Sequence, residues 1–267
     1  MRKHSIEEVK KDYNEYLELF IKAEKGDPKS EFKLARCYLR GDIFKKNEEL
    51  GIHYLTKSAK SGNSKAQNDI GEILYDGDIL EQNLEEAFEW YTKSANQGSL
   101  AGKYNQGWCY YMGEGTKKNL EKAYKNFNYG SEKGDSICQN MLGIFYQKGI
   151  YVDKDQKQAF KYFRISAENG DVEGEFNLAM CYKNGFGTSK NKSNAKKWFS
   201  KSAKKGYPDA VKELWLIDEK IINKEININK AYKSYCESFN KKYQSEWDKI
   251  EKEKFEESIK WYILTEN

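Results

Sequence analysis

The side chains that most often do chemistry in enzymes are scarce in this chain, and their spacing favours no catalytic arrangement. The 267 residues include two histidines, His4 and His53. Neither is spaced with a cysteine or serine as nucleophilic catalysis requires, and no cysteine–histidine cluster has the spacing of a zinc site. We therefore predict that the chain is not an enzyme, and we expect no catalytic residue, no metal site and no cofactor.

Two glycine motifs could be mistaken for phosphate-binding loops. They are Gly113-Glu114-Gly115 and Gly185-Phe186-Gly187. A phosphate-binding loop follows a strand and opens a helix, whereas each of these motifs follows a predicted helix, so we interpret both as turns. Paired carboxylates such as Glu85 and Glu86 stand at a predicted helix start, where they favour the helix dipole.

The feature that organises the whole chain is a repeat of 36 residues. It is clearest in residues 84–98, an amphipathic segment that ends in glycine and recurs along the sequence. A fixed period of this length is typical of solenoid proteins, in which each unit packs on its neighbours. Three series of residues keep the period: Gly26, Gly62, Gly98, Gly134, Gly170 and Gly206; Gly41, Gly77, Gly113, Gly149 and Gly185; and Gly51, Ala87, Ala123, Ala159, Ala195 and Ala231.

The period predicts five repeats between two capping segments. Residues 1–27 are expected to form an N-terminal capping helix, which its apolar positions predict and Gly26 ends. Residues 208–267 keep the register faintly and predict a degenerate sixth repeat followed by a C-terminal capping helix at about 241–265, with a docking tail at 261–264 as the alternative. The repeats span residues 28–63, 64–99, 100–135, 136–171 and 172–207.

Each repeat is expected to hold two helices, A and B. In the first repeat, helix A is predicted at Pro28–Arg40 and helix B at Asn47–Ser61. Pro28 suits a first helical turn, where its missing N–H costs nothing, and the glycine series suit helix C-termini, where positive φ is needed. The small helix-A position 35/71/107/143/179 predicts the close approach of a neighbouring helix backbone.

A stripe of apolar positions on helix A, spaced i, i+4 and i+8, predicts the core. Helix B contributes two aromatic-rich positions that should fill the space between the helices. Equivalent members are Leu34, Ile70, Gln106, Leu142 and Leu178 on helix A, and Leu55, Tyr91, Phe127, Phe163 and Phe199 on helix B. Gln106, and Asn126 at the second helix-B position, interrupt this pattern.

The repeat resembles the Sel-one-like repeat (SLR), a relative of the tetratricopeptide repeat. The match is closest at Ala87, Trp90, Tyr91, Ala95 and Gly98, and at Leu178, Ala179, Tyr182, Gly185 and Gly187. The resemblance covers residues 28–207 and implies an all-α, right-handed α/α superhelical solenoid whose A helices line a concave face. It also implies a scaffold or adaptor role. Repeats one, two and four depart from the pattern because they lack the second loop glycine.

The helix-A positions opposite the core stripe are the candidate binding face for a protein partner. Repeat one offers basic residues there, repeat two offers acidic residues, and repeats three to five offer tryptophan, methionine and isoleucine. Exposed apolar clusters often mark binding sites, and methionine adapts to a partner's shape. The alternative is that these apolar side chains pack on adjacent A helices. The candidate residues are Lys33, Arg36, Arg40, Asp69, Glu72, Asp76, Trp108, Met112, Met141, Ile144 and Met180, with Trp108 and Arg36 as the expected anchors.

A lysine-rich block in repeat five is a second candidate surface. Residues 176–208 contain eight lysines and no acidic residue. The block predicts either a solvated face or a contact with an acidic protein or with phosphates. A net charge of +4 does not by itself imply nucleic acid, which we do not expect as a partner. The possible basic patch comprises Lys190, Lys192, Lys196, Lys197, Lys201, Lys204 and Lys205.

The cysteines and the amino terminus favour a reducing compartment. Cys37, Cys109 and Cys181 share one repeat position, and two repeats should separate them too widely for a disulfide. We predict that they are small core residues. No apolar run follows the charged amino terminus, so no secretory signal is expected, and no stretch is apolar enough to suggest a membrane span. We expect a cytoplasmic protein that does not contact a membrane.

Three functions remain open at this point. The first is a scaffold or adaptor that grips a protein segment on the concave face. The second is an immunity protein that neutralises a bacterial toxin by direct binding. The third, and most remote, is β-lactam hydrolysis. This activity is associated with a secreted branch of the repeat family whose regularly paired cysteines and export signal are not found here. The sequence does not indicate an oligomeric state.

Overall fold

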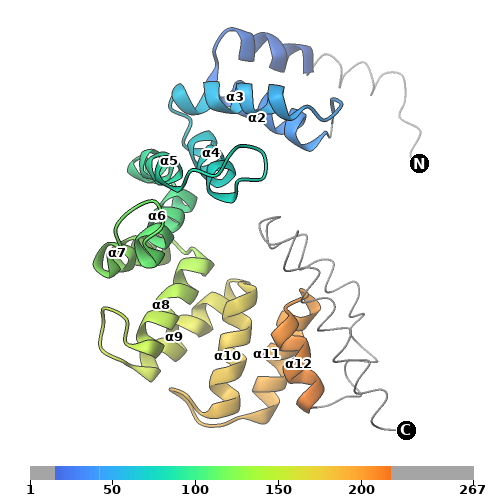
Figure 1. Ribbon diagram of the computed structural model, residues 1–267. Helices are drawn as coiled ribbons and strands as arrows, with labels where there is room; N and C mark the ends of the chain where they lie inside the picture. Colours follow the sequence, from blue (N-terminus) through green and yellow to red (C-terminus); the bar gives the residue numbers. More distant parts are fainter. Residues whose placement is uncertain (1–15, 42, 218–267) are drawn as a thin grey trace, which may run out of the picture. The chain divides into compact units, whose positions relative to one another are not determined.

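The computed structural model describes residues 16–41 and 43–217, apart from the side chain of Trp215. The chain divides into two compact units, residues 1–133 and 134–267. Helices α2 to α7 belong to unit 1, and α8 to α12 belong to unit 2 (Figure 1). His4, Ala231, Cys236 and the expected helix at 241–265 lie outside the described residues.

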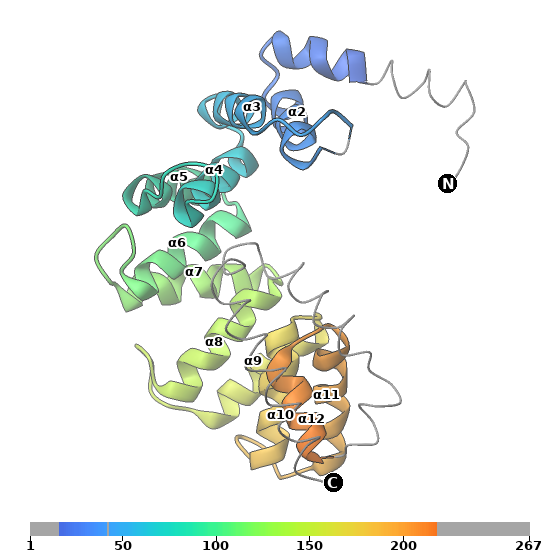
Figure 2. The ribbon, with the colours of Figure 1, turned by 45° about the vertical axis from the view of Figure 1, so that its right-hand side comes forward.

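All regular structure in the described residues is helical, and every repeat is one helix pair, so the predicted all-α solenoid fold is confirmed. A further helical segment at 16–24 precedes α2. The helices of unit 1 are α2 Pro28–Arg40, α3 Glu48–Lys60, α4 Ser64–Asp76, α5 Leu84–Asn96, α6 Leu100–Met112 and α7 Leu120–Glu132. Those of unit 2 are α8 Ser136–Lys148, α9 Gln156–Glu168, α10 Val172–Asn184, α11 Lys192–Lys204 and α12 Pro208–Ile217. Within each unit every helix packs on the next, and Figures 1 and 2 both show α10, α11 and α12 side by side.

The helix ends follow from local chemistry. Each helix from α2 to α11 begins after an Asp, Asn or Ser whose side chain accepts a first-turn N–H, which satisfies an otherwise orphaned donor. Every A helix ends at a left-handed glycine, as in α4, where Gly77 has φ of 77°. The glycine that follows each B helix also has positive φ, as in Gly98 at 79°. Both glycine series therefore stand where a side chain would be strained.

The small helix-A position exists because a ring of helix B packs against it. A Cβ added at Gly71 would lie 2.6 Å from the Tyr91 ring, and one added at Gly143 would lie 2.5 Å from the Phe163 ring. The sequence predicted the approach of a neighbouring helix backbone at this position. The close contact found there is made mainly by an aromatic side chain of the same repeat instead.

The two polar residues that interrupt the core pattern compensate for each other. Asn126 donates from Nδ2 to Oε1 of Gln106 over 2.9 Å, and Gln106 donates from Nε2 to the Thr92 hydroxyl over 2.9 Å. Both side chains are buried. A buried amide without partners would cost free energy, so these two polar side chains are tolerated in the core because their hydrogen bonds satisfy them.

A buried serine on helix B ties the two helices of a repeat together. Ser58, Ser94, Ser166 and Ser202 each donate to the backbone carbonyl of the first residue of their helix A, over 2.6 to 2.9 Å. All four are fully buried. Gly130 takes this position in the third repeat. The serine register was not singled out in the sequence, although its period is visible there.

The second loop glycine allows one repeat to touch the backbone of the preceding repeat. A Cβ on Gly115 would lie 1.9 Å from the carbonyl oxygen of Leu84, the first residue of α5. Gly187 approaches the carbonyl oxygen of Gln156 in the same way. Tyr151 stands at the equivalent position of repeat four and keeps the left-handed turn, with φ of 61°. These motifs are turns, as predicted, and their glycines are packing contacts between neighbouring repeats.

Candidate functional site

The A-helix face of unit 1 is formed by one row of side chains on each of α2, α4 and α6. The α2 row is basic: Lys33 and Arg40 are exposed, and Arg36 is half-buried. The Arg36 guanidinium carbon lies 5.6 Å from the centre of the Phe32 ring. Arg36 is therefore partly engaged within its own helix, although its expected role as an anchor stays a prediction.

The α4 row is acidic and is held by amide donors. Glu72 accepts from Asn68 over 2.9 Å and from Asn105 of α6 over 3.3 Å. Asn105 also donates to the side-chain Oδ1 of Asn68 over 2.9 Å. Asp69 and Asp76, on either side of Glu72, are half-buried. Amide donors orient a carboxylate without cancelling its charge, so the row keeps a negative field.

Burial and mutual repulsion make two of these carboxylates weak acids. Burial, followed by the charge of Glu72, raises the pKa of Asp69 to about 7, although Arg40 and Lys65 act in the opposite direction. Burial, followed by the charges of Glu72 and Asp78, raises the pKa of Asp76 to about 6. A cation placed beside this row would therefore relieve the repulsion.

The α6 row begins with an indole that is fixed by a hydrogen-bond chain. Trp108, which is half-buried, donates from Nε1 to the Tyr75 hydroxyl over 3.3 Å, and Tyr75 donates to the carboxylate of Glu114. Burial raises the pKa of Glu114. Because Tyr75 belongs to α4, the chain joins the two A helices and holds Trp108 in one orientation.

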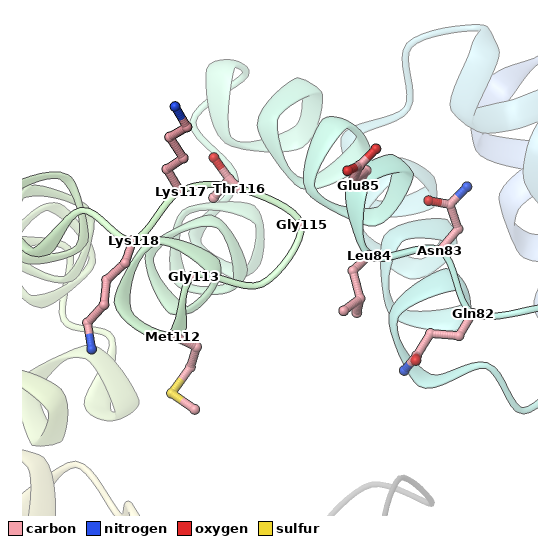
Figure 3. A pocket seen from close by; sticks show the side chains of 10 residues that line it. All are labelled: Gln82, Asn83, Leu84, Glu85, Met112, Gly113, Gly115, Thr116, Lys117 and Lys118. Atoms are coloured by element: carbon pink, nitrogen blue, oxygen red, sulfur yellow. The ribbon is translucent and has the colours of Figure 1, made fainter.

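Met112, the last residue of α6, is the exposed apolar member of the face and lines a cavity. Its side chain is 46% exposed. The cavity has a volume of ≈ 870 Å³ and lies between the loop before α5 and the loop before α7. Figure 3 shows the side chains of Met112, Leu84 and Gln82 on one side of these loops, and those of Glu85, Thr116 and Lys117 on the other.

The candidate residues of unit 2 are less exposed than Met112. Met141 is buried, at 5% exposure. Ile144 packs against the cluster that contains Phe163, and Met180 packs against the cluster that contains Phe199. Met141 is therefore not part of an exposed apolar floor, because it packs between helices of unit 2. Ile144 and Met180 are half-buried, so their part in binding stays a prediction.

The lysine block is less free than its sequence suggests. The Lys205 ammonium lies 2.9 Å from the buried carboxylate of Glu175 and donates to the Gly170 carbonyl, so it is a structural ion pair. The Lys201 ammonium stacks 4.0 Å from the Trp198 ring centre. Lys196 is half-buried. The exposed members are Lys190, Lys192, Lys197, Lys201 and Lys204, and binding by this patch stays a prediction.

The groups usually used in catalysis are dispersed in the part of the chain that the structure describes. His53 is exposed on α3. Of the three cysteines expected in the core, Cys109 and Cys181 are buried and Cys37 is half-buried. Burial raises the pKa of the Cys109 and Cys181 thiols to about 12, which makes them poor nucleophiles. Across residues 16–41 and 43–217, no three His, Cys, Asp or Glu side chains are placed to hold a metal ion. None of the helices described is long and apolar enough to cross a bilayer.

Sequence reasoning missed several residues that shape the site. Asn68, Tyr75 and Glu114 were not selected, because each lies one position away from the face or in a loop. Leu84 and Gln82 line the cavity although they belong to another repeat. The spacing of two asparagines by 37 residues could have predicted the Asn68–Asn105 contact. The same spacing occurs in unit 2, where Asn177 Nδ2 donates to Asn140 Oδ1 over 2.8 Å.

The stacked helix pairs, with a polar and apolar face built from their A helices, define an α/α repeat protein. Five copies of the Sel1 repeat are recognised in the sequence, at residues 28–63, 64–99, 101–135, 136–171 and 172–207. The chain belongs to the Sel1 repeat family. Proteins of this family generally mediate protein–protein interactions.

Solved structures of similar proteins support the same assignment. A Sel1 repeat protein from Oxalobacter formigenes is 30% identical, with a TM-score of 0.69 over 81% of this chain and 86% of that one. A protective antigen with an SLR fold, present in uropathogenic Escherichia coli strains, is 26% identical, with a TM-score of 0.65 over 81% of this chain. The match spans 47% of the length of that antigen.

More distant similarity extends to immunity proteins. One from Pseudomonas aeruginosa is 17% identical, with a TM-score of 0.55 over 79% of this chain and 82% of that one. At this identity the likeness concerns the fold alone. A comparison with curated protein sequences finds no match.

Proposed function

We propose that this protein is an interaction scaffold or adaptor that binds a segment of a partner protein on the A-helix face of unit 1. The observation that carries the proposal is Met112, a large apolar side chain that is 46% exposed at the edge of a cavity. The adjoining rows supply fixed polar groups. A surface with an apolar anchor point and a polar surround is the usual anatomy of a protein-binding site.

The rigidity of the face also supports binding. Glu72 is held by two amides, and Trp108 is held through Tyr75. Groups that are already ordered lose little conformational entropy when a partner arrives. A partner would therefore meet a preorganised surface on α4 and α6, with the adaptable side chain of Met112 beside it.

A pull-down from native lysate with three forms of the full chain tests this role. The forms are wild type, Met112→Glu and the control Ile137→Glu. Ile137 is 45% exposed on α8 of unit 2, so the control removes an equally exposed apolar side chain elsewhere. We expect wild type and the control to retain the same protein, and Met112→Glu to lose it. Retention by all three forms would refute binding at this face.

The immunity role is a narrower form of the same proposal. It has the support of fold likeness to an immunity protein at 17% identity, which says nothing about the partner. The identity of the retained protein decides between the two roles. A toxin whose activity is blocked by wild type and not by Met112→Glu would establish immunity, and a non-toxic partner would leave the adaptor role.

A further inference from the structure

We propose that unit 2 binds an acidic helical segment of a partner protein on its B helices, where exposed cations of α9 and α11 pair with the carboxylates of the segment. This surface belongs to a different unit from the A-helix face described above, so it adds a second binding surface to the proposed function. We call it the basic face, and it is made by six side chains: Lys157, Lys161, Arg164, Lys197, Lys201 and Lys204.

The six cations of the basic face form one stripe on each helix. The three on α9 are spaced i, i+4 and i+7, and the three on α11 have the same spacing. Residues with this spacing share one side of a helix, and positions four apart are separated by about 6 Å along its axis. All six side chains are exposed. Each helix therefore presents a regular row of positive charge to solvent.

The two stripes lie on neighbouring helices. Trp198 of α11 packs against the cluster that contains Ala159 and Phe163 of α9. The Lys205 ammonium, one residue after α11, donates to the carbonyl of Gly170, two residues after α9. A segment laid over this face can therefore meet cations from both helices.

Four of the six cations are not neutralised by the protein itself. Within residues 16–41 and 43–217, no ion pair or hydrogen bond involves the side chains of Lys157, Lys161, Arg164 and Lys197. Neighbouring like charges repel one another and create a positive potential over the surface. A partner that brings negative charge to this face would relieve the repulsion.

The B helices of unit 1 do not share this charge pattern. Helices α3, α5 and α7 together hold seven glutamates and five lysines, whereas α9 and α11 hold eight lysines and arginines and one glutamate. The first turns of α3, α5 and α7 contain glutamate, and those of α9 and α11 contain no acidic residue. Basic residues in a first turn oppose the helix dipole, so helix stability does not explain the charge of unit 2.

The chemistry of the face favours an acidic helix over two other anionic partners. Single-stranded nucleic acids stack their bases on aromatic rings, but the Trp198 ring is half-buried and the Lys201 ammonium lies 4.0 Å from its centre. Amphipathic helices that bind membrane surfaces bury apolar side chains there, and none of the large exposed apolar side chains of the described residues belongs to α9 or α11. An acidic helix needs neither feature, because glutamates spaced i, i+4 and i+7 match each stripe.

Fluorescence anisotropy with two labelled, alanine-rich helical peptides of identical composition tests the inference. In the striped peptide the glutamates follow the i, i+4 and i+7 spacing, and in the scattered peptide they are spread around the helix. The full chain is used as wild type, as Lys161→Glu/Lys197→Glu, and as the control Lys29→Glu/Lys60→Glu, which makes the same change of net charge at two exposed lysines of unit 1. We expect wild type and the control to bind the striped peptide at least about tenfold more tightly than the first variant, the effect of roughly one lost charge contact.

Wild type should also prefer the striped peptide to the scattered one, and added salt should weaken the binding because it screens charge. Equal affinity for the two peptides would overturn the match to an acidic helix. Equal binding of the striped peptide by wild type and Lys161→Glu/Lys197→Glu would overturn the basic face as its site.

Two competing probes test the class of partner. They are a duplex oligonucleotide and vesicles that contain phosphatidylserine, each added to the complex of wild type with the striped peptide. We expect neither to displace the peptide at an equal concentration of negative charge, and displacement by either one would overturn the assignment to a protein segment. Circular dichroism of each variant confirms that it is folded.

Discussion

The replacement of Gly115 by alanine should test whether neighbouring repeats are joined by a glycine-to-carbonyl contact. Gly115 has φ of 65°, and an added Cβ would lie 1.9 Å from the carbonyl oxygen of Leu84 and 2.5 Å from its carbonyl carbon. The contacted atoms are backbone atoms of the first turn of α5. Relief therefore requires a shift of the whole loop or of the helix end, because no flexible side chain can move aside.

The expected loss has two parts. A left-handed conformation costs an alanine roughly 1–2 kcal/mol, and overpacking against a fixed neighbour costs roughly 1–3 kcal/mol. Gly62 supplies the matched control in the same unit, because it has φ of 91° and nothing lies within 4 Å of an added Cβ. Gly62→Ala should therefore show the first part alone, about 1–2 kcal/mol.

Urea unfolding followed by circular dichroism at 222 nm compares the two variants. For an unfolding slope of about 2 kcal/mol/M, the additional loss in Gly115→Ala should lower the urea midpoint by on the order of 1 M relative to Gly62→Ala. Midpoints are compared because repeat arrays need not unfold in one step. Equal midpoints for the two variants would refute the contact as a source of stability.

Three further predictions follow from the packing. Ser94→Ala should lower the unfolding free energy by about 1 kcal/mol, because the Ser64 carbonyl loses its 2.7 Å donor, and a loss no larger than for an exposed serine would contradict this. Lys205→Met should lower the free energy of unfolding by about 1–3 kcal/mol, because it leaves the carboxylate of Glu175, which is 4% exposed, without its cation. This loss should be smaller when Glu175→Gln is present as well. The pKa of Asp69 in the folded protein is about 7, against an ordinary value of 3.8. Between these two pH values the folded state therefore binds more protons than the unfolded state. Because of this, Asp69 makes the free energy of unfolding fall as pH rises from 4 to 7. Asp69→Asn should therefore stabilise the protein at pH 8 and not at pH 4 in thermal melts, and an equal effect at both pH values would disprove the shift.

The position of a side chain on its helix could be predicted from the repeat, whereas its burial could not, because burial depends on the neighbouring helices. The rows on α2, α4 and α6 were found from their spacing, and Met112 is exposed as expected. Met141 occupies the same position in its repeat as Asp69 and Asn105 occupy in theirs, yet it is buried. Spacing fixes the direction in which a side chain leaves its helix, but burial depends on what stands opposite, and that differs between repeats.

The helices themselves were determined by the local sequence. Capping side chains such as Asn47, glycines with positive φ such as Gly41, and the apolar period are all read within one turn of the chain, so the ends of α2 and α3 could be predicted closely. The family resemblance rests on the same local positions, because they form the repeat and not its surface.

Contacts between repeats were decided only in the tertiary structure. Gln106 and Asn126 are polar residues at core positions of the repeat, and they form a hydrogen-bonded pair of buried amides. The contact of Gly115 with the Leu84 carbonyl, and the cavity beside Met112, join residues from different repeats. The sequence alone specified which side chains each helix offers to its neighbours. The distances between those side chains depend on how the helices stack, and these distances created both the cavity and the weak acids of the α4 row.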